Sequence, residues 1–143
     1  MPFHAPIPRM TRYAKGANAE RELVHLLFDK GFSVIRTAGS GKTSLPAPDI
    51  IAMKPSKHLA FECKAWASNN LSIPVASMEE FLSWCTRAGV EAIIAWKYPR
   101  KGWFFLKPEM LHNTGKYYAI SKKDAERHNQ YLEVVTGIQA QLK

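Results

Sequence analysis

The chain has 143 residues, enough for one domain with a buried core, and its 46% hydrophobic content indicates a folded globular protein. Its 20 lysines and arginines outnumber its 12 aspartates and glutamates, and the resulting formal charge of +8 favours a polyanionic partner such as nucleic acid. Two cysteines are too few for a disulfide framework, the scattered histidines argue against zinc, and no apolar run reaches the ~18 residues of a membrane span.

Hydrophobic periodicity predicts the elements of the first half. Residues 1–12 are expected to be a flexible tail, followed by a single domain over residues 13–143. An amphipathic helix is predicted over 17–30, with Gly31 closing it. Strands are predicted over 32–38, 49–53 and 58–65, and the last two are joined by a turn at 54–57.

The second half is predicted to continue with a helix and more strands. Ser77 and Glu80 have the spacing of a capping box, which predicts a helix from Ser77 to Gly89. Strands follow over 90–96, 102–106 and 117–120, and a C-terminal helix begins near residue 131. Cys63 and Cys85 are expected to be buried free thiols. The order predicts an α/β fold in which helices flank a mixed central sheet.

Three residues in the middle of the chain carry the clearest chemical pattern. Because alternate strand residues share a face, Glu62 and Lys64 lie side by side on the predicted strand 58–65. If Met53 pairs with His58 across the turn, Asp49 comes directly opposite Glu62. Two carboxylates this close repel one another unless a cation lies between them, and hard oxygen ligands suit Mg²⁺ or Mn²⁺. The alternative interpretation is a surface salt bridge with Lys64.

Glu20 adds to this pattern because the helical wheel places it on the apolar face of the first helix, whereas Glu22 points to solvent. An inward carboxylate needs a metal or an ion-pair partner, and Arg36 on the next strand is the candidate for such a pair. The loop that follows contains Gly41-Lys42-Thr43 but lacks the glycine spacing and the helix of a phosphate-binding loop. We interpret Lys42 as a residue that contacts a DNA backbone.

Together these residues resemble the archaeal Holliday junction resolvases of the restriction-endonuclease-like, PD-(D/E)xK superfamily. The matching blocks are KGANAEREL at 15–23, GFSVIRTAGS at 31–40, PDI at 48–50, ECK at 62–64, AWK at 95–97, GW at 102–103 and EVVTGIQ at 133–139. The stretches 41–47 and 113–129 depart from the family pattern in length or variability. Contacts to DNA made by these loops therefore cannot be transferred from the family.

The resemblance implies a restriction-endonuclease-like fold and a homodimer that nicks two opposed strands of a four-way DNA junction with Mg²⁺, for which Mn²⁺ substitutes. It implies a catalytic set made of Glu20, Ser40, Asp49, Glu62 and Lys64. In this set Glu20, Asp49 and Glu62 hold the metal. Arg21, Arg36, Lys42 and Lys97 are the expected DNA contacts.

Two other functions fit the same residues. The first is a restriction-like or repair endonuclease acting on ordinary duplex, since the superfamily shares its active-site residues. The second is a basic DNA-binding module without catalysis, which predicts loss of at least one of Asp49, Glu62 or Lys64, although all three are present. A cytoplasmic, nucleoid-associated protein with recombination or replication accessory partners is expected.

Overall fold

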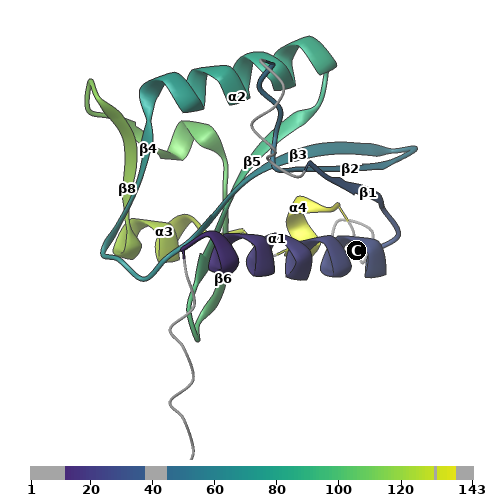
Figure 1. Ribbon diagram of the computed structural model, residues 1–143, viewed down its shortest axis with the longest axis horizontal. Helices are drawn as coiled ribbons and strands as arrows, with labels where there is room; N and C mark the ends of the chain where they lie inside the picture. Colours follow the sequence, from purple (N-terminus) through teal and green to yellow (C-terminus); the bar gives the residue numbers. More distant parts are fainter. Residues whose placement is uncertain (1–11, 38–44, 131, 138–143) are drawn as a thin grey trace, which may run out of the picture.

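The computed structural model describes residues 12–37, 45–130 and 132–137 (Figure 1). Its helices and strands, in chain order, are α1 (Arg12–Asp29), β1 (Ser33–Arg36), β2 (Ile50–Lys54), β3 (Lys57–Ala65), β4 (Asn70–Pro74), α2 (Val75–Ala88), β5 (Glu91–Tyr98), β6 (Gly102–Leu106), η1 (Pro108–Met110), β7 (His112–Asn113), β8 (Tyr117–Ser121), α3 (Lys122–His128) and α4 (Leu132–Val135).

The central sheet has five strands in the order β1-β2-β3-β5-β6. The β3 and β5 strands are parallel and the other neighbours are antiparallel, so the sheet is mixed, as predicted. The chain passes from β3 to β5 through β4 and α2, and β4 joins a second sheet in the order β4-β8-β7. The predicted pairing of Met53 with His58 is confirmed, and the turn between these strands is only Pro55-Ser56 because Lys54 also pairs with Lys57.

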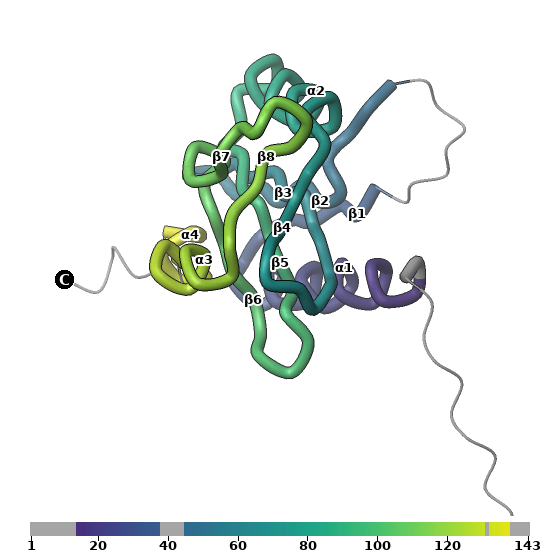
Figure 2. Tube along the Cα trace, turned by 90° about the vertical axis from the view of Figure 1, so that its left-hand side faces the viewer, coloured from purple at the N-terminus to yellow at the C-terminus, as the bar shows by residue number. Residues whose placement is uncertain are grey.

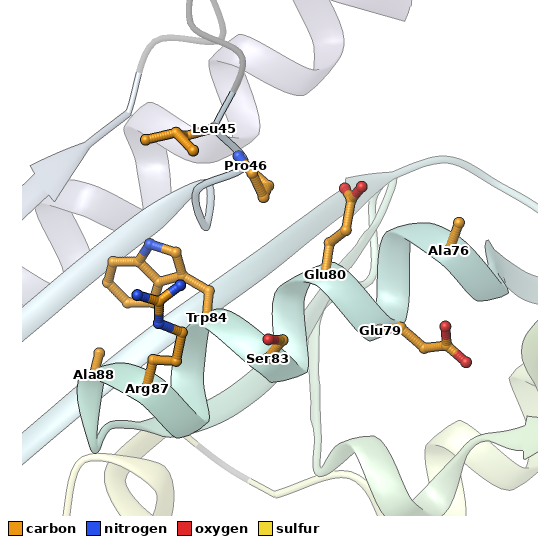
Figure 3. Close-up of a pocket in the computed structure, with 9 residues that line it drawn as sticks. All are labelled: Leu45, Pro46, Ala76, Glu79, Glu80, Ser83, Trp84, Arg87 and Ala88. Atoms are coloured by element: carbon orange, nitrogen blue, oxygen red, sulfur yellow. The ribbon is translucent and has the colours of Figure 1, made fainter.

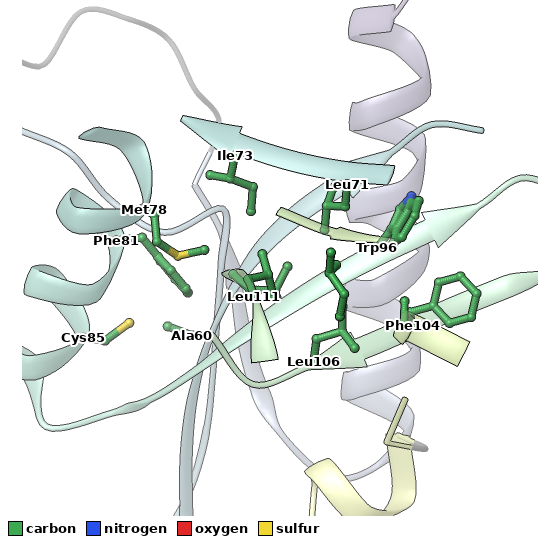
Figure 4. Packing of buried hydrophobic residues seen from close by; sticks show 13 residues of the cluster. Ala60, Leu71, Ile73, Met78, Phe81, Cys85, Trp96, Phe104, Leu106 and Leu111 are labelled. Atoms are coloured by element: carbon green, nitrogen blue, oxygen red, sulfur yellow. The ribbon is translucent and has the colours of Figure 1, made fainter. Parts of the chain in front are cut away.

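Helices cover both faces of the central sheet, with α1 on one side and α2 on the other (Figures 1 and 2). Alternation along β3 divides the buried side chains between two clusters. Ala60 packs in the cluster beneath α2, and Phe61 packs in the cluster beneath α1. Figure 4 shows the first cluster, in which Met78 and Phe81 of α2 meet residues from both sheets. The expected α/β architecture with flanking helices is confirmed.

Several local predictions are wrong in detail. Helix α1 begins at Arg12 and not at residue 17. The capping box at Ser77 is absent, because α2 begins at Val75 after Pro74 and no side chain caps its first turn. Ser77 therefore lies inside the helix. The short elements β4, β7 and α3 were not predicted.

Other local predictions agree with the structure. Gly89 ends α2 with a positive φ of 71°, a conformation that costs glycine little. Cys63 and Cys85 are both buried and free. In the described part of the chain, no helix has the length and apolar character needed to cross a membrane.

Candidate active site

Asp49 and Glu62 lie together where β2 begins beside the second half of β3. The Cys63 backbone N–H donates to Asp49 Oδ2 over 2.8 Å, and the carboxyl groups of Asp49 and Glu62 are hydrogen-bonded to each other. The predicted arrangement differs in one respect. Ile50 is the ladder partner of Phe61, and the Asp49 N–H also donates to the Phe61 carbonyl, over 3.0 Å. Asp49 therefore does not form a regular cross-strand pair with Glu62. Its carboxyl group still meets that of Glu62.

Burial perturbs both carboxyl groups, and the charge of Asp49 adds to the effect on Glu62. Burial, followed by the neighbouring charge of Asp49, raises the pKa of Glu62 from 4.5 to about 7. Burial also raises the pKa of Asp49, although the Cys63 N–H and Lys64 oppose this effect. A hydrogen bond between two carboxyl groups requires one proton, and the raised pKa of Glu62 favours keeping that proton up to about pH 7. Such a pair is poised to exchange that proton for a cation.

Lys64 lies beside the pair, as the spacing of two residues along β3 predicted. Its Nζ is 3.6 Å from Glu62 Oε1, and its charge lowers the pKa of both Asp49 and Glu62. The salt bridge considered as an alternative therefore exists. It does not neutralise the pair, because the pKa of each carboxyl group remains above its ordinary value.

Glu20 lies on the inner face of α1, as the helical wheel predicted, with its side chain 17% exposed. Arg36 Nε donates to Glu20 Oε1 over 3.1 Å, so the ion pair considered from the sequence is present. Burial is the main cause of the raised pKa of Glu20, and the charge of Asp49 is the second. Glu20 is therefore an Arg36 partner that is also electrostatically coupled to the Asp49 carboxylate.

Thr37 is a site residue that the sequence analysis missed. Its N–H donates to the Asp49 carbonyl over 3.0 Å, which extends the β1–β2 pairing by one residue. Its hydroxyl donates to the Pro48 carbonyl and lies 3.2 Å from the Asp49 carbonyl. Thr37, directly after β1, and Phe61 of β3 thus hold the backbone of Asp49 from both sides, and the Cys63 N–H holds its carboxylate. The sequence offers no signal for this contact, since a threonine at a strand end is common.

The residues expected to contact DNA differ in their exposure and in the side chains that they bind. Arg21 is exposed on α1. Lys97 is bound to a carboxylate, because its Nζ donates to Glu22 Oε1 over 2.9 Å and lies 5.6 Å from the centre of the Trp103 ring. Trp103 Nε1 also donates to Glu22, over 3.2 Å, so Glu22 is exposed as predicted but not free. Ser40 and Lys42 lie outside the described residues.

The carboxylate pair opens into a small cleft between the central sheet and the first half of α2. Pro46 and Ala47 line one side, and Ser77, Glu80 and Phe81 of α2 line the other. A larger hollow over α2, lined by Leu45, Trp84 and Arg87 among others, shares Pro46 and Glu80 with this cleft (Figure 3), but neither catalytic carboxylate lines it. The smaller cleft is therefore the one in which a phosphate can approach Asp49 and Glu62.

The donor set suits a divalent cation with two protein carboxylates. Two oxygen-bearing side chains that repel each other favour a hard cation that leaves room for water and phosphate. Within residues 12–37, 45–130 and 132–137, no three His, Cys, Asp or Glu side chains gather closely enough to hold a metal ion. Glu20, bound to Arg36, is thus not grouped with Asp49 and Glu62 as a third ligand, and its direct metal-binding role stays a prediction.

Comparisons with known proteins agree with the geometry of the site. A family model described as archaeal Holliday junction resolvase (Hjc) matches residues 11–141. Crossover junction endodeoxyribonuclease Hjc of Archaeoglobus fulgidus is 37% identical over 109 residues, which cover 76% of this chain and 80% of the relative. The enzyme of the same name from Methanocaldococcus jannaschii is 33% identical over 132 residues, which cover 92% and 94%.

A solved structure of Archaeoglobus fulgidus Hjc, a Holliday junction resolvase from an archaeal hyperthermophile, has the same fold. The comparison gives a TM-score of 0.77 at 33% identity and covers 84% of this chain and 97% of that one. The family match spans all of the described residues, including Glu20, Asp49, Glu62 and Lys64. The chain therefore belongs to the archaeal Holliday junction resolvase family.

Proposed function

We propose that this chain is a crossover junction endodeoxyribonuclease that nicks two opposed strands of a four-way DNA junction, with Mg²⁺ as its metal and Mn²⁺ as a substitute. The observation that carries the proposal is the partly buried Asp49–Glu62 pair beside Lys64, in a member of this family. The formal charge of +8 supports a polyanionic substrate.

Asp49 and Glu62 would hold the metal. When bound there, a divalent cation polarises the scissile phosphate and lowers the pKa of an attacking water. The Cys63 N–H fixes Oδ2 of Asp49 and so sets the direction of the carboxylate before any ligand arrives. Thr37 does the same for the backbone of Pro48 and Asp49. This preorganisation means that little rearrangement is needed at the moment of reaction.

Lys64 and the Glu20–Arg36 pair would complete the site. Lys64, 3.6 Å from Glu62, is placed to orient the attacking water or to stabilise the negative charge that develops on the phosphate. Arg36 holds Glu20 over 3.1 Å, close enough to Asp49 for their charges to interact. In our proposal Glu20 acts on the water or the metal environment, while Arg36 orients Glu20 and faces the DNA backbone.

The chain carries one copy of this catalytic set, and a junction must be cut on two strands. We propose that two chains form a symmetric homodimer in which each chain cuts one strand, since isologous pairing is the commonest route to such symmetry. Arg21, Ser40, Lys42 and Lys97 remain predicted contributors to DNA binding or catalysis. Recombination or replication proteins are the expected accessory partners.

The test is cleavage of a four-way junction compared with a duplex that has the sequence of one of its arms. We expect paired, symmetric nicks in the junction with Mg²⁺, weak or no cleavage of the duplex, and no cleavage in EDTA. Equal cleavage of both substrates would mean that the enzyme acts on ordinary duplex DNA and does not select the junction. Full activity in EDTA would overturn the metal assignment.

A further inference from the structure

The turn between β5 and β6 contains an arginine in an unfavourable backbone conformation. Lys101 N–H donates to the Tyr98 carbonyl over 3.0 Å, and Pro99 is the second residue of this turn. Arg100, the third residue, has a φ of 66°. Turns with a proline second and a positive φ third normally use glycine or asparagine at the third position. Among the described residues Arg100 is the only non-glycine with a positive φ, so something other than the turn favours the arginine.

Arg100 and Lys101 are two adjacent, exposed positive charges. Neither forms an ion pair with any residue that the structure describes, whereas the nearby Lys97 is bound to Glu22 at 2.9 Å. The β5–β6 hairpin that carries them projects past α1 in both views (Figures 1 and 2). A strained backbone is thus retained where it presents two unneutralised cations to solvent.

The tip of this hairpin lies beyond the same end of the sheet as the catalytic lysine. Because β3 and β5 are parallel, both strands run in the same direction, and Lys64 pairs with Trp96. Tyr98, where the turn starts, is two residues farther along β5, which corresponds to ~7 Å at the rise of a strand. Phosphates recur about every 3.4 Å along each DNA strand. A strand passing Lys64 can therefore pass the tip within a few nucleotides.

We propose that the tip of the β5–β6 hairpin, Pro99 to Lys101, is a DNA-contact arm in which Arg100 and Lys101 bind backbone phosphates of a junction arm next to the scissile phosphate. This proposal rests on the proposed function. It assigns to Arg100 and Lys101 the phosphate-binding role for which Lys97, already bound to Glu22, is less available. The contact reads charge and position and not base sequence.

The test uses junction binding as a function of salt concentration, with Arg100→Gly, Lys101→Ala and the wild-type chain. Arg100→Gly removes the cation and also relieves the backbone, so the variant is expected to fold at least as well as the wild type. Each lost phosphate contact should reduce the slope of log K against log salt by about 0.9. We expect each variant to bind the junction several-fold more weakly, with an unchanged or higher melting temperature for Arg100→Gly. Lys107→Ala, at the opposite end of β6, is the matched loss of one positive charge and should keep the wild-type slope.

Two outcomes would overturn the proposal. The first is an unchanged slope and affinity for both tip variants in a chain whose wild type binds and cleaves the junction. The second is an equal effect of Lys107→Ala, which would mean that any surface charge contributes. A wild type that fails to bind a four-way junction would overturn the proposed function and the arm with it, whereas the two outcomes above overturn the arm alone.

Discussion

Replacing Glu62 by glutamine is expected to stabilise the metal-free protein at alkaline pH. Glu62 and Asp49 are partly buried side by side; this burial, followed by the neighbouring charge of Asp49, raises the pKa of Glu62 from 4.5 to about 7. The unfolded chain releases this proton near the ordinary pKa, whereas the folded protein keeps it until about pH 7. A glutamine of the same shape can donate its amide N–H to Asp49 in place of the shared proton and carries no charge.

The direction and size of the effect follow from these two pKa values. Below pH 4.5 Glu62 is protonated in both states and makes no difference to stability. As the pH rises from 4.5 to about 7, the free energy of unfolding of the wild type falls, because the unfolded state loses its proton first. The full difference between the two pKa values corresponds to about 3 kcal/mol. For a chain of this length, such a change moves the melting temperature by roughly 9 °C.

The assay is thermal unfolding of the wild type and Glu62→Gln in EDTA between pH 4 and 8.5. The variant should gain on the wild type as the pH rises and be the more stable protein at pH 8, whereas Glu109→Gln, at an exposed position, should not. Addition of Mg²⁺ at pH 8 should stabilise the wild type more than Glu62→Gln. A Glu62→Gln protein no more stable than the wild type at pH 8 would refute the picture of two repelling carboxylates.

Three further predictions concern positioning and assembly. Glu20→Gln should lower the single-turnover cleavage rate by at least ~100-fold with junction affinity retained. Glu22→Gln, the control, should change the rate only modestly. A stable, fully active Glu20→Gln enzyme would leave Glu20 as an ion-pair partner only. Thr37→Val should lower the rate by roughly tenfold because the Pro48–Asp49 backbone loses a hydrogen bond, and Thr37→Ser should restore it; equal rates for both would remove Thr37 from the site. Light scattering should give the mass of two 16.2 kDa chains, and a monomer that still makes paired cuts would contradict the homodimer.

The sequence predicts the catalytic strands well because the physics there is local. Alternation along residues 58–65 assigns Phe61 to the core and Glu62 with Lys64 to the other face, and the short turn sets the register of Met53 with His58. The inward position of Glu20 on α1 also follows from a local rule, the 3.6-residue period of a helix. These positions could be predicted because each depends on its neighbours in the chain.

What the sequence could not give depends on distant partners. The departure of Asp49 from the regular ladder, the Thr37 hydroxyl on Pro48 and the bonds of Glu22 to Lys97 and Trp103 all join separate elements. Strand β4 could not be predicted from its local sequence, because its pairing partner, β8, lies far along the chain. The capping box failed because α2 begins at Val75, directly after Pro74 and two residues earlier than the serine pattern suggested.

The most direct test of the account measures junction binding and single-turnover cleavage on the same four-way junction for the wild type and Asp49→Asn. The asparagine keeps the shape of the side chain that the Cys63 N–H holds but removes its charge from the carboxylate pair. We expect Asp49→Asn to bind the junction about as tightly as the wild type, because affinity comes from phosphate contacts spread over the surface. Its cleavage should fall to background in Mg²⁺ and in Mn²⁺. An Asp49→Asn protein that cuts the junction at a rate near that of the wild type would contradict the assignment of the Asp49–Glu62 pair as the catalytic centre.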